Sequence, residues 1–148
     1  MVKTAIQRLE YLCDYIPPLL SALTESEFSA MPQGMTWSRK QILGHLIDSA
    51  SNNHQRFVRV QFEDVPLISY DQNKWNAHGY YHLLNGAELI PFWTSYNKHL
   101  AALAKNIPEN FLQRQCKMGD QSLVTLGFLI TDYVEHLEHH LGQIVSYK

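Results

Sequence analysis

The chain has 148 residues, of which 45% are hydrophobic and 18% are charged, and its formal net charge is −2. This length suits a single domain over residues 1–148, and the composition is that of an ordinary globular protein with a sizeable core. No apolar run approaches the roughly 20 residues that span a bilayer, and the lysines and arginines are scattered, so we expect neither a membrane nor a nucleic-acid partner.

The first segment, from about residue 3 to residue 23, has apolar residues at helical spacing. Pro17 and Pro18 are expected to kink this helix or to split it in two. Glu10 interrupts what would be the apolar core of a signal peptide, and no small-residue cleavage site follows it, so we expect a cytoplasmic location. The apolar positions are Ile6, Leu9, Leu12, Ile16, Leu19, Leu20 and Leu23.

The second segment has the best-marked helix start in the sequence. Ser38 followed by Gln41 three residues later fits a capping box, in which the two side chains bond each other's backbone N–H groups. We expect a helix from Arg39 to about Phe62, closed by Pro66. Its apolar stripe is Ile42, Leu46, Ala50, Phe57 and Val60.

A long connection rich in Asp, Asn, Tyr and Trp follows, roughly from residue 63 to residue 86. Long loops in compact domains are often binding elements. This one is interpreted as a lid over the open end of the helices, as a wall of a substrate pocket, or as both, because aromatic rings with polar tips suit a small organic ligand. His78 and His82 are interpreted as surface residues rather than a second metal site. The candidate pocket residues are Tyr70, Trp75, Tyr81 and, from the last helix, Tyr133.

Two more helices complete the expected fold. The third begins between Asn85 and Pro91 and ends before Pro108. The fourth runs from Asp120 or Ser122, either of which can cap it, to the C-terminus. Strand signals are weak throughout. The sequence therefore predicts an all-α four-helix bundle with one longer crossover around the connection at 63–86.

Three histidines fall within five residues near the end of the chain, in the stretch "HLEHHLGQI". On a helical wheel that turns about 100° per residue, His136 and His140 lie on the shoulder of the apolar stripe, whereas His139 lies on the solvated side. Histidines at positions i and i+4 lie one above the other and can both reach one ion. The alternative is that these imidazoles are only solvated or hydrogen-bonded, because one HxxxH pair in a histidine-rich chain is a weak signal.

His45 has a similar place on the second helix, at the shoulder of its apolar stripe. If the second and fourth helices are neighbours, His45, His136 and His140 form a three-imidazole set facing inward, where helical bundles build metal sites. Three protein nitrogens leave one coordination position open for water or substrate, as in a catalytic zinc site. Imidazole binds Zn, Ni, Cu and Fe alike, so the ligands do not select the metal.

Polar residues near these histidines are candidates for supporting roles. Asp48, one turn further along the second helix, is the candidate catalytic base; it could instead orient an imidazole or be solvated, and the sequence favours a solvated position. Gln143, Asp132 and Asn52 are candidates to hydrogen-bond the second nitrogens of the ligands. Neither signature of the zincin proteases is present, so no glutamate base adjoins the histidines in the sequence.

The stretches "WSRKQILGHLIDSASNNHQRF" and "YVEHLEHHLGQI" resemble the DinB/YfiT-like superfamily of metal-dependent four-helix bundles. The resemblance covers nearly the whole chain. It rests on a Trp at the start of the second helix, a histidine in the sequence GHL, and the pattern HxxxHxxQ in the last helix. It implies that the family's three metal-binding histidines are His45, His136 and His140. It also implies zinc or nickel as the metal and a homodimer.

The superfamily includes bacillithiol and mycothiol S-transferases, a thiol-dependent maleylpyruvate isomerase and proteins described as metal-dependent hydrolases. The expected function is therefore a divalent-metal-dependent enzyme for a small-molecule substrate, acting as a thiol S-transferase that activates a low-molecular-weight thiol, or water. Sulfur transfer needs only a positioned thiolate, which suits a site without a glutamate base. A metal-dependent hydrolase is the rival enzyme. A non-enzymatic metal-binding stress-response protein is the alternative from another class.

Overall fold

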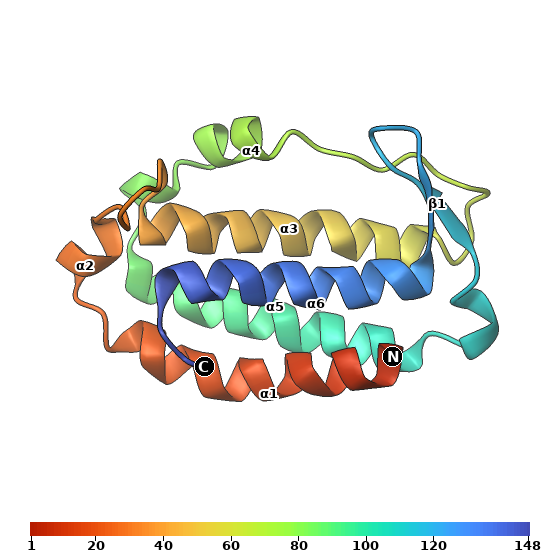
Figure 1. The fold of residues 1–148 in the computed structure, drawn as a ribbon, viewed down its shortest axis with the longest axis horizontal. Coiled ribbons are helices and arrows are strands. Elements are labelled where there is room, and N and C mark those ends of the chain that lie inside the picture. The colour runs from red at the N-terminus through yellow and green to blue at the C-terminus, as the bar shows by residue number, and fades with distance from the viewer.

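The computed structural model describes residues 1–148 and is drawn in Figure 1. The four long helices are α1 (Val2–Ser21), α3 (Arg39–Arg59), α5 (Gly86–Asn106) and α6 (Leu126–Ile144). Helices α1 and α3 each pack against both α5 and α6, so the four helices form a square with α1 and α3 at opposite corners. The prediction of an all-α four-helix bundle is confirmed.

The chain direction of these helices explains the long crossover. The colours of Figure 1 show that α3 and α5 run one way, whereas α1 and α6 run the other way. Parallel neighbours begin at the same end of the bundle, so the chain must return along its length between α3 and α5. A helix of 21 residues, such as α3, is about 30 Å long. A short turn cannot cover that distance, and the segment between residues 60 and 85 makes the return.

This crossover is not the structureless loop that the sequence suggested. It contains α4 (Gln72–Gly79), which packs on α3, and the 3₁₀ turn η1 (Tyr81–Leu83). Asp71 caps α4, because its Oδ1 accepts hydrogen bonds from the backbone N–H groups of Asn73 at 3.1 Å and Lys74 at 3.0 Å. Only Asn76 is buried within α4, so the apolar periodicity that marks the long helices is missing here.

Two further differences concern the N-terminal third of the chain. Pro17 and Pro18 do not split α1, which continues to Ser21. The short helix α2 (Glu25–Ser29) was not predicted, although its capping box of Thr24 and Glu27 is visible in the sequence.

Helix α3 begins as predicted. Ser38 Oγ accepts a hydrogen bond from Gln41 N at 3.1 Å, and Gln41 Oε1 accepts one from Ser38 N at 2.8 Å. The helix ends at Arg59, three residues before the predicted end. Its whole predicted stripe is buried, and it faces α5 and α6. The buried residues of the stripe are Ile42, Leu46, Ala50, Phe57 and Val60.

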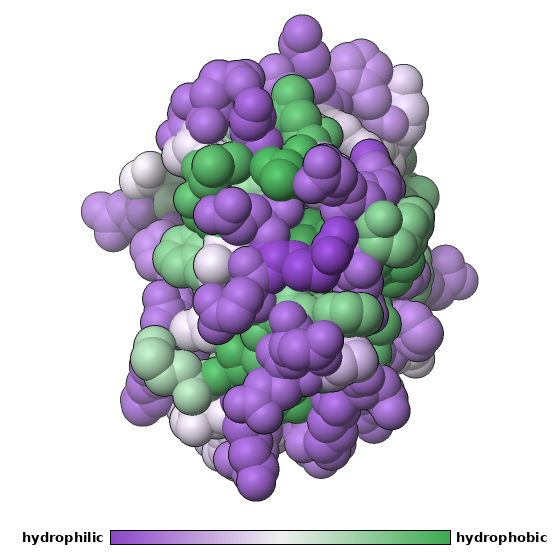
Figure 2. Space-filling model, turned by 90° about the vertical axis from the view of Figure 1, so that its right-hand side faces the viewer, coloured by the Kyte–Doolittle hydropathy of each residue, from purple (hydrophilic) through white to green (hydrophobic).

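A small antiparallel hairpin precedes the last helix. It pairs β1 (Gln115–Lys117) with β2 (Leu123–Thr125), and α6 starts only at Leu126, capped by Thr125. The predicted helix start at Asp120 or Ser122 is therefore wrong. Asp120 does bond the backbone two residues later, with Oδ1 3.0 Å from Ser122 N, but this bond shapes the hairpin turn. Figure 2 looks onto this end of the bundle, where hydrophobic residues lie scattered among polar ones.

The core lies between the four long helices and forms one continuous cluster. Trp93 of α5 is its largest fully buried side chain. On the surface, Arg8 of α1 forms an ion pair with Glu138 of α6 at 2.7 Å. None of the helices has the length and apolar character needed to cross a membrane.

Candidate metal centre

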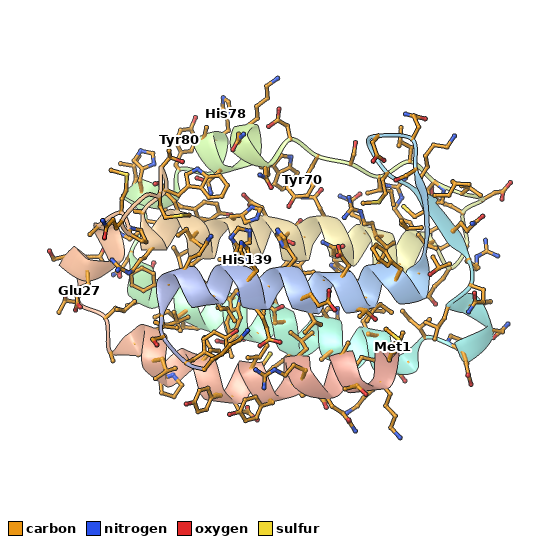
Figure 3. The ribbon with its side chains drawn as sticks, viewed as in Figure 1. Met1, Glu27, Tyr70, His78, Tyr80 and His139 are labelled. Atoms are coloured by element: carbon orange, nitrogen blue, oxygen red, sulfur yellow. The ribbon has the colours of Figure 1, made fainter.

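The candidate metal centre lies between the antiparallel helices α3 and α6. His45 of α3 is completely buried, whereas His136 and His140 of α6 are half-buried. Nε2 of His136 lies 3.5 Å from Nε2 of His45 and 3.1 Å from Nε2 of His140. One ligand atom from each histidine lies within 4.8 Å of the other two. His139, labelled in Figure 3, is the exposed residue on the same turn of α6.

The spacing of these nitrogens fits a shared ion better than hydrogen bonds among the rings. A neutral imidazole donates through one nitrogen and accepts through the other, so three Nε2 atoms that face one another are not satisfied by their own protons. Nitrogens at about 2.0–2.1 Å from a tetrahedral ion lie about 3.3–3.4 Å apart. The two observed separations, 3.1 Å and 3.5 Å, bracket that value. The donor set therefore fits a divalent transition metal.

The electrostatics of the site favour neutral imidazoles. Burial, reinforced by the neighbouring imidazoles, lowers the pKa of His45 to about 3 and that of His136 to about 4. Burial also lowers the pKa of His140, although the bond to Gln143 opposes this shift. Metal ligation requires the neutral form, so at pH 7 all three rings can offer a lone pair.

Two neighbouring side chains orient two of the three imidazole rings. His140 Nδ1 lies 2.8 Å from Gln143 Oε1; this oxygen can only accept, so Nδ1 carries the proton and Nε2 keeps its lone pair. Gln143 thus occupies the supporting position that the sequence predicted. The indole of Trp37 packs against the ring of His45, with centroids 5.1 Å apart. Nδ1 of His45 is buried without a hydrogen-bond partner, so packing holds this ring.

Comparison with known proteins assigns the chain to a family. The family model of the DinB superfamily matches residues 8–144. The chain belongs to the DinB superfamily. A candidate metal-dependent hydrolase of Halalkalibacterium halodurans is 28% identical over 87% of this chain and 78% of its own length. Another, YfiT of Bacillus subtilis, is 23% identical over 95% of this chain and 80% of its own length.

Solved structures of other proteins share this DinB fold. The structure of Bacillus subtilis YfiT, described as a probable metal-dependent hydrolase with an unusual four-helix bundle topology, aligns with a TM-score of 0.88 at 23% identity. It covers 97% of this chain and 83% of that one. A mycothiol-dependent maleylpyruvate isomerase aligns with a TM-score of 0.80 at 12% identity, over 97% of this chain and 60% of that one.

Asp48 has an environment in this DinB chain that the sequence did not indicate. It is only 4% exposed, so the favoured interpretation as a solvated residue is wrong. Its Oδ1 accepts a hydrogen bond from the hydroxyl of Tyr81 at 2.5 Å, whereas Oδ2 is buried and has no partner. Burial raises the pKa of Asp48, and the bond from Tyr81 opposes this shift.

Two of the candidate supporting residues do not hold an imidazole. Asn52 Nδ2 donates instead to the backbone oxygen of Asp48 at 2.9 Å, within α3. Asp132 is exposed and forms no hydrogen bond with the three histidines. The wheel placed both residues within reach of the site, but it does not show which backbone groups compete for a side chain.

The predicted pocket residues divide into two groups. Tyr133 belongs to the bundle core, where it is 3% exposed and its hydroxyl bonds Asn97 Oδ1 at 2.5 Å; it does not form a pocket wall. Tyr70 and Trp75 pack edge to face in the crossover, with ring centroids 5.7 Å apart. Tyr81 belongs to the crossover but is buried, and its ring packs over Gly44 of α3 so that its hydroxyl reaches Asp48.

A cavity of about 450 Å³ lies where α4 covers α3. Its lining residues are Asp48, Lys74, Trp75, His78 and Gly79. Figure 3 shows Tyr70 and His78 on this side of the bundle. Lys74 and Gly79 were not among the predicted site residues, because nothing in the sequence showed that residues 72–79 form a helix. His78 and His82 are exposed and belong to no group of three potential metal ligands.

Proposed function

We propose that the chain is a divalent-metal-dependent enzyme and that it transfers a low-molecular-weight thiol to a small electrophilic substrate. The observation that carries this proposal is the convergence of three neutral Nε2 atoms from His45, His136 and His140, with no carboxylate in the group. When bound there, a zinc or nickel ion lowers the pKa of a thiol or water in its remaining coordination position.

Side chains near the metal centre would position the ligands and the substrate. Gln143 keeps the proton of His140 on Nδ1, and Trp37 holds the ring of His45 by packing. Asp48, one helical turn after His45, would hold a hydrogen-bond donor of the substrate through its unpartnered Oδ2. The thiol proton would pass to water, and a carbon–sulfur bond would form as the bond to the leaving group breaks.

Hydrolysis is the second candidate, and the descriptions of the relatives favour it. The Halalkalibacterium and Bacillus proteins are both described as candidate metal-dependent hydrolases. The same three histidines would serve that reaction, with water in place of the thiol. The two reactions differ in one requirement, which is whether turnover needs a thiol.

The metal site is tested by removing one ligand. His136→Ala should lose bound metal almost completely and keep the fold, because the apolar core rather than the histidines defines the bundle. His139→Ala is the matched control, since His139 lies on the same turn of α6 but is exposed; it should keep its metal. The measurements are metal content and circular dichroism of both purified variants. Full metal retention in His136→Ala would refute the site.

The reaction is tested on the metal-loaded protein. A panel of low-molecular-weight thiols with a haloarene should give thiol-dependent turnover, whereas ester and amide substrates without thiol should not be cleaved. Thiol-independent turnover of an ester or amide would replace the transferase with the hydrolase. Tight metal binding without turnover on any electrophile would favour a metal-binding protein that is not an enzyme.

A further inference from the structure

The cavity between α3 and α4 is lined by a carboxyl group, one of whose oxygens has no protein partner. Asp48 lines this cavity and is 4% exposed, and its Oδ2 has no hydrogen-bond partner. A buried polar atom that lacks a partner costs free energy, because it has lost its hydrogen bonds to water. A ligand that donates a hydrogen bond to Oδ2 would recover that free energy, and an ammonium group would do so most strongly.

The opposite wall of the cavity has the opposite charge. Lys74 and His78 line it from α4. His78 Nδ1 lies 2.8 Å from the backbone oxygen of Lys74 and must donate to it. The ammonium group of Lys74 gives this wall a positive charge. It would repel a simple amine and attract an anionic group of a ligand.

The remaining lining also suits a small organic ligand. Trp75 is 40% exposed and its ring is braced by Tyr70, so an aromatic surface borders the charged groups. The ring of Tyr81 is fixed from two sides, since a Cβ on Gly44 would lie 2.2 Å from it and a Cβ on Gly79 would lie 2.7 Å from it. The carboxylate that Tyr81 bonds is therefore held in place before a ligand arrives.

We infer that this cavity binds a small zwitterion of the amino-acid type, with its ammonium group on Asp48 and its carboxylate on Lys74. This inference deepens the proposed function and rests on it in one respect, which is that the zwitterion is the thiol substrate. Asp48 follows His45 by one helical turn, and side chains at this spacing are neighbours on a helix surface. None of the three histidines lines the cavity, so the proximity of the ligand to the metal centre rests on this helical spacing and belongs to the inference.

Three thiols test separately whether the ammonium group and the carboxylate group of the ligand contribute to binding. L-cysteine has both charges, 3-mercaptopropionate lacks only the ammonium group, and cysteamine lacks only the carboxylate. In calorimetric titrations of the metal-loaded protein, L-cysteine should bind at least about ten-fold more tightly than 3-mercaptopropionate, as expected for one charge-assisted hydrogen bond. Equal affinities for these two thiols would overturn the inference. Metal content is measured after each titration to exclude extraction of the metal by the thiol.

Single-residue variants test which side chains produce the preference for L-cysteine over 3-mercaptopropionate. Asp48→Asn should bind L-cysteine and 3-mercaptopropionate equally, and Lys74→Met should weaken both of these thiols without weakening cysteamine. Gln72→Ala is the matched control, because Gln72 is an exposed residue of α4 that does not line the cavity; it should keep the preference for L-cysteine. An unchanged preference in Asp48→Asn would refute the assignment. Lys74 is exposed, so its variant tests the inference even if Asp48→Asn does not fold.

Ligands without sulfur test whether the cavity binds a zwitterion even if the protein does not transfer a thiol. L-serine and 3-hydroxypropionate form the matched pair, and both are titrated into His136→Ala. A preference for L-serine that disappears in Asp48→Asn/His136→Ala would support the cavity even if the protein catalysed no thiol transfer. No preference for L-serine, together with no preference for L-cysteine in the wild type, would overturn the cavity and leave the metal centre untouched.

Discussion

At the scale of single residues, the candidate site depends on side chains that hold other side chains. Gln143 fixes the tautomer of His140, Trp37 packs against His45, and Tyr81 bonds Asp48. The sequence indicated Gln143, because a residue three positions after a helical ligand lies on the same face. It named Tyr81 only as a candidate pocket residue and not as a partner of Asp48, because no local pattern describes the path of the crossover that carries Tyr81.

Replacing Gln143 should weaken metal binding without removing it. Gln143→Leu takes away the acceptor for His140 Nδ1, so that ring can turn and present the wrong nitrogen. Loss of such a supporting bond lowers metal affinity by about 10-fold to 100-fold. Competition with a chelator measures the affinity. Gln143→Glu retains an acceptor and should lose much less, so equal affinities for Gln143→Leu and the wild type would contradict this role.

Gly44 is required because the ring of Tyr81 lies directly on it. A Cβ at position 44 would lie 2.2 Å from this ring, and the ring belongs to a buried side chain with little room to move. Gly44→Ala should therefore lower the free energy of unfolding by about 1–3 kcal/mol, as overpacking does. Gly142→Ala in α6 has nothing within 4 Å of its Cβ and should be neutral or stabilising. Urea unfolding compares the two.

At the scale of secondary structure elements, sequence patterns identified the long helices and missed the short ones. The starts of α3 and α5 were predicted within a few residues, since caps and prolines are local signals. Helix α4 and the hairpin were missed because neither has an apolar stripe of its own. Their residues are held by contact with α3 and with the start of α6. Such contacts do not produce a regular spacing of apolar residues in the sequence.

The stability of α4 should depend strongly on its cap. Asp71 accepts two hydrogen bonds from the first turn of α4, and α4 buries only Asn76. Asp71→Ala should expose the amides of residues 72–79 to faster hydrogen exchange, while global stability falls by no more than about 1 kcal/mol. Hydrogen exchange followed by mass spectrometry measures the exchange of residues 72–79 and of the rest of the chain. Unchanged exchange in residues 72–79 would mean that packing on α3, rather than the cap, holds α4.

At the scale of the whole molecule, the bundle brings together histidines that lie 91 residues apart in sequence. The helical wheels placed each histidine on the correct shoulder of its helix. The wheels gave no information on which helices are neighbours, and the site exists only because α3 packs against α6. The family resemblance supplied that arrangement in advance, whereas periodicity alone left it open.

The three imidazoles of the candidate metal centre should make the metal-free protein sensitive to acid. The pKa of His45 is about 3 and that of His136 is about 4 in the folded state, below the ordinary value of 6.5. Between these values the unfolded chain binds more protons than the folded one, so stability falls as the pH drops below about 6.5.

Thermal unfolding of the metal-free protein from pH 7 to pH 5 measures this effect. Over this range most carboxyl groups keep their charge, so the histidines dominate. The melting temperature should fall as the pH is lowered, and the fall should be smaller in His45→Gln/His136→Gln. A wild-type melting temperature that stays constant over this range would contradict the assignment of buried neutral histidines.

The parallel course of α3 and α5 has an evolutionary consequence. The segment that joins them must exist for reasons of connectivity, but little of its composition is dictated by the core that it passes over. Substitutions in this crossover can therefore reshape the cavity between α3 and α4 while the four-helix scaffold stays unchanged. A single architecture of this kind can diverge toward many ligands without being rebuilt.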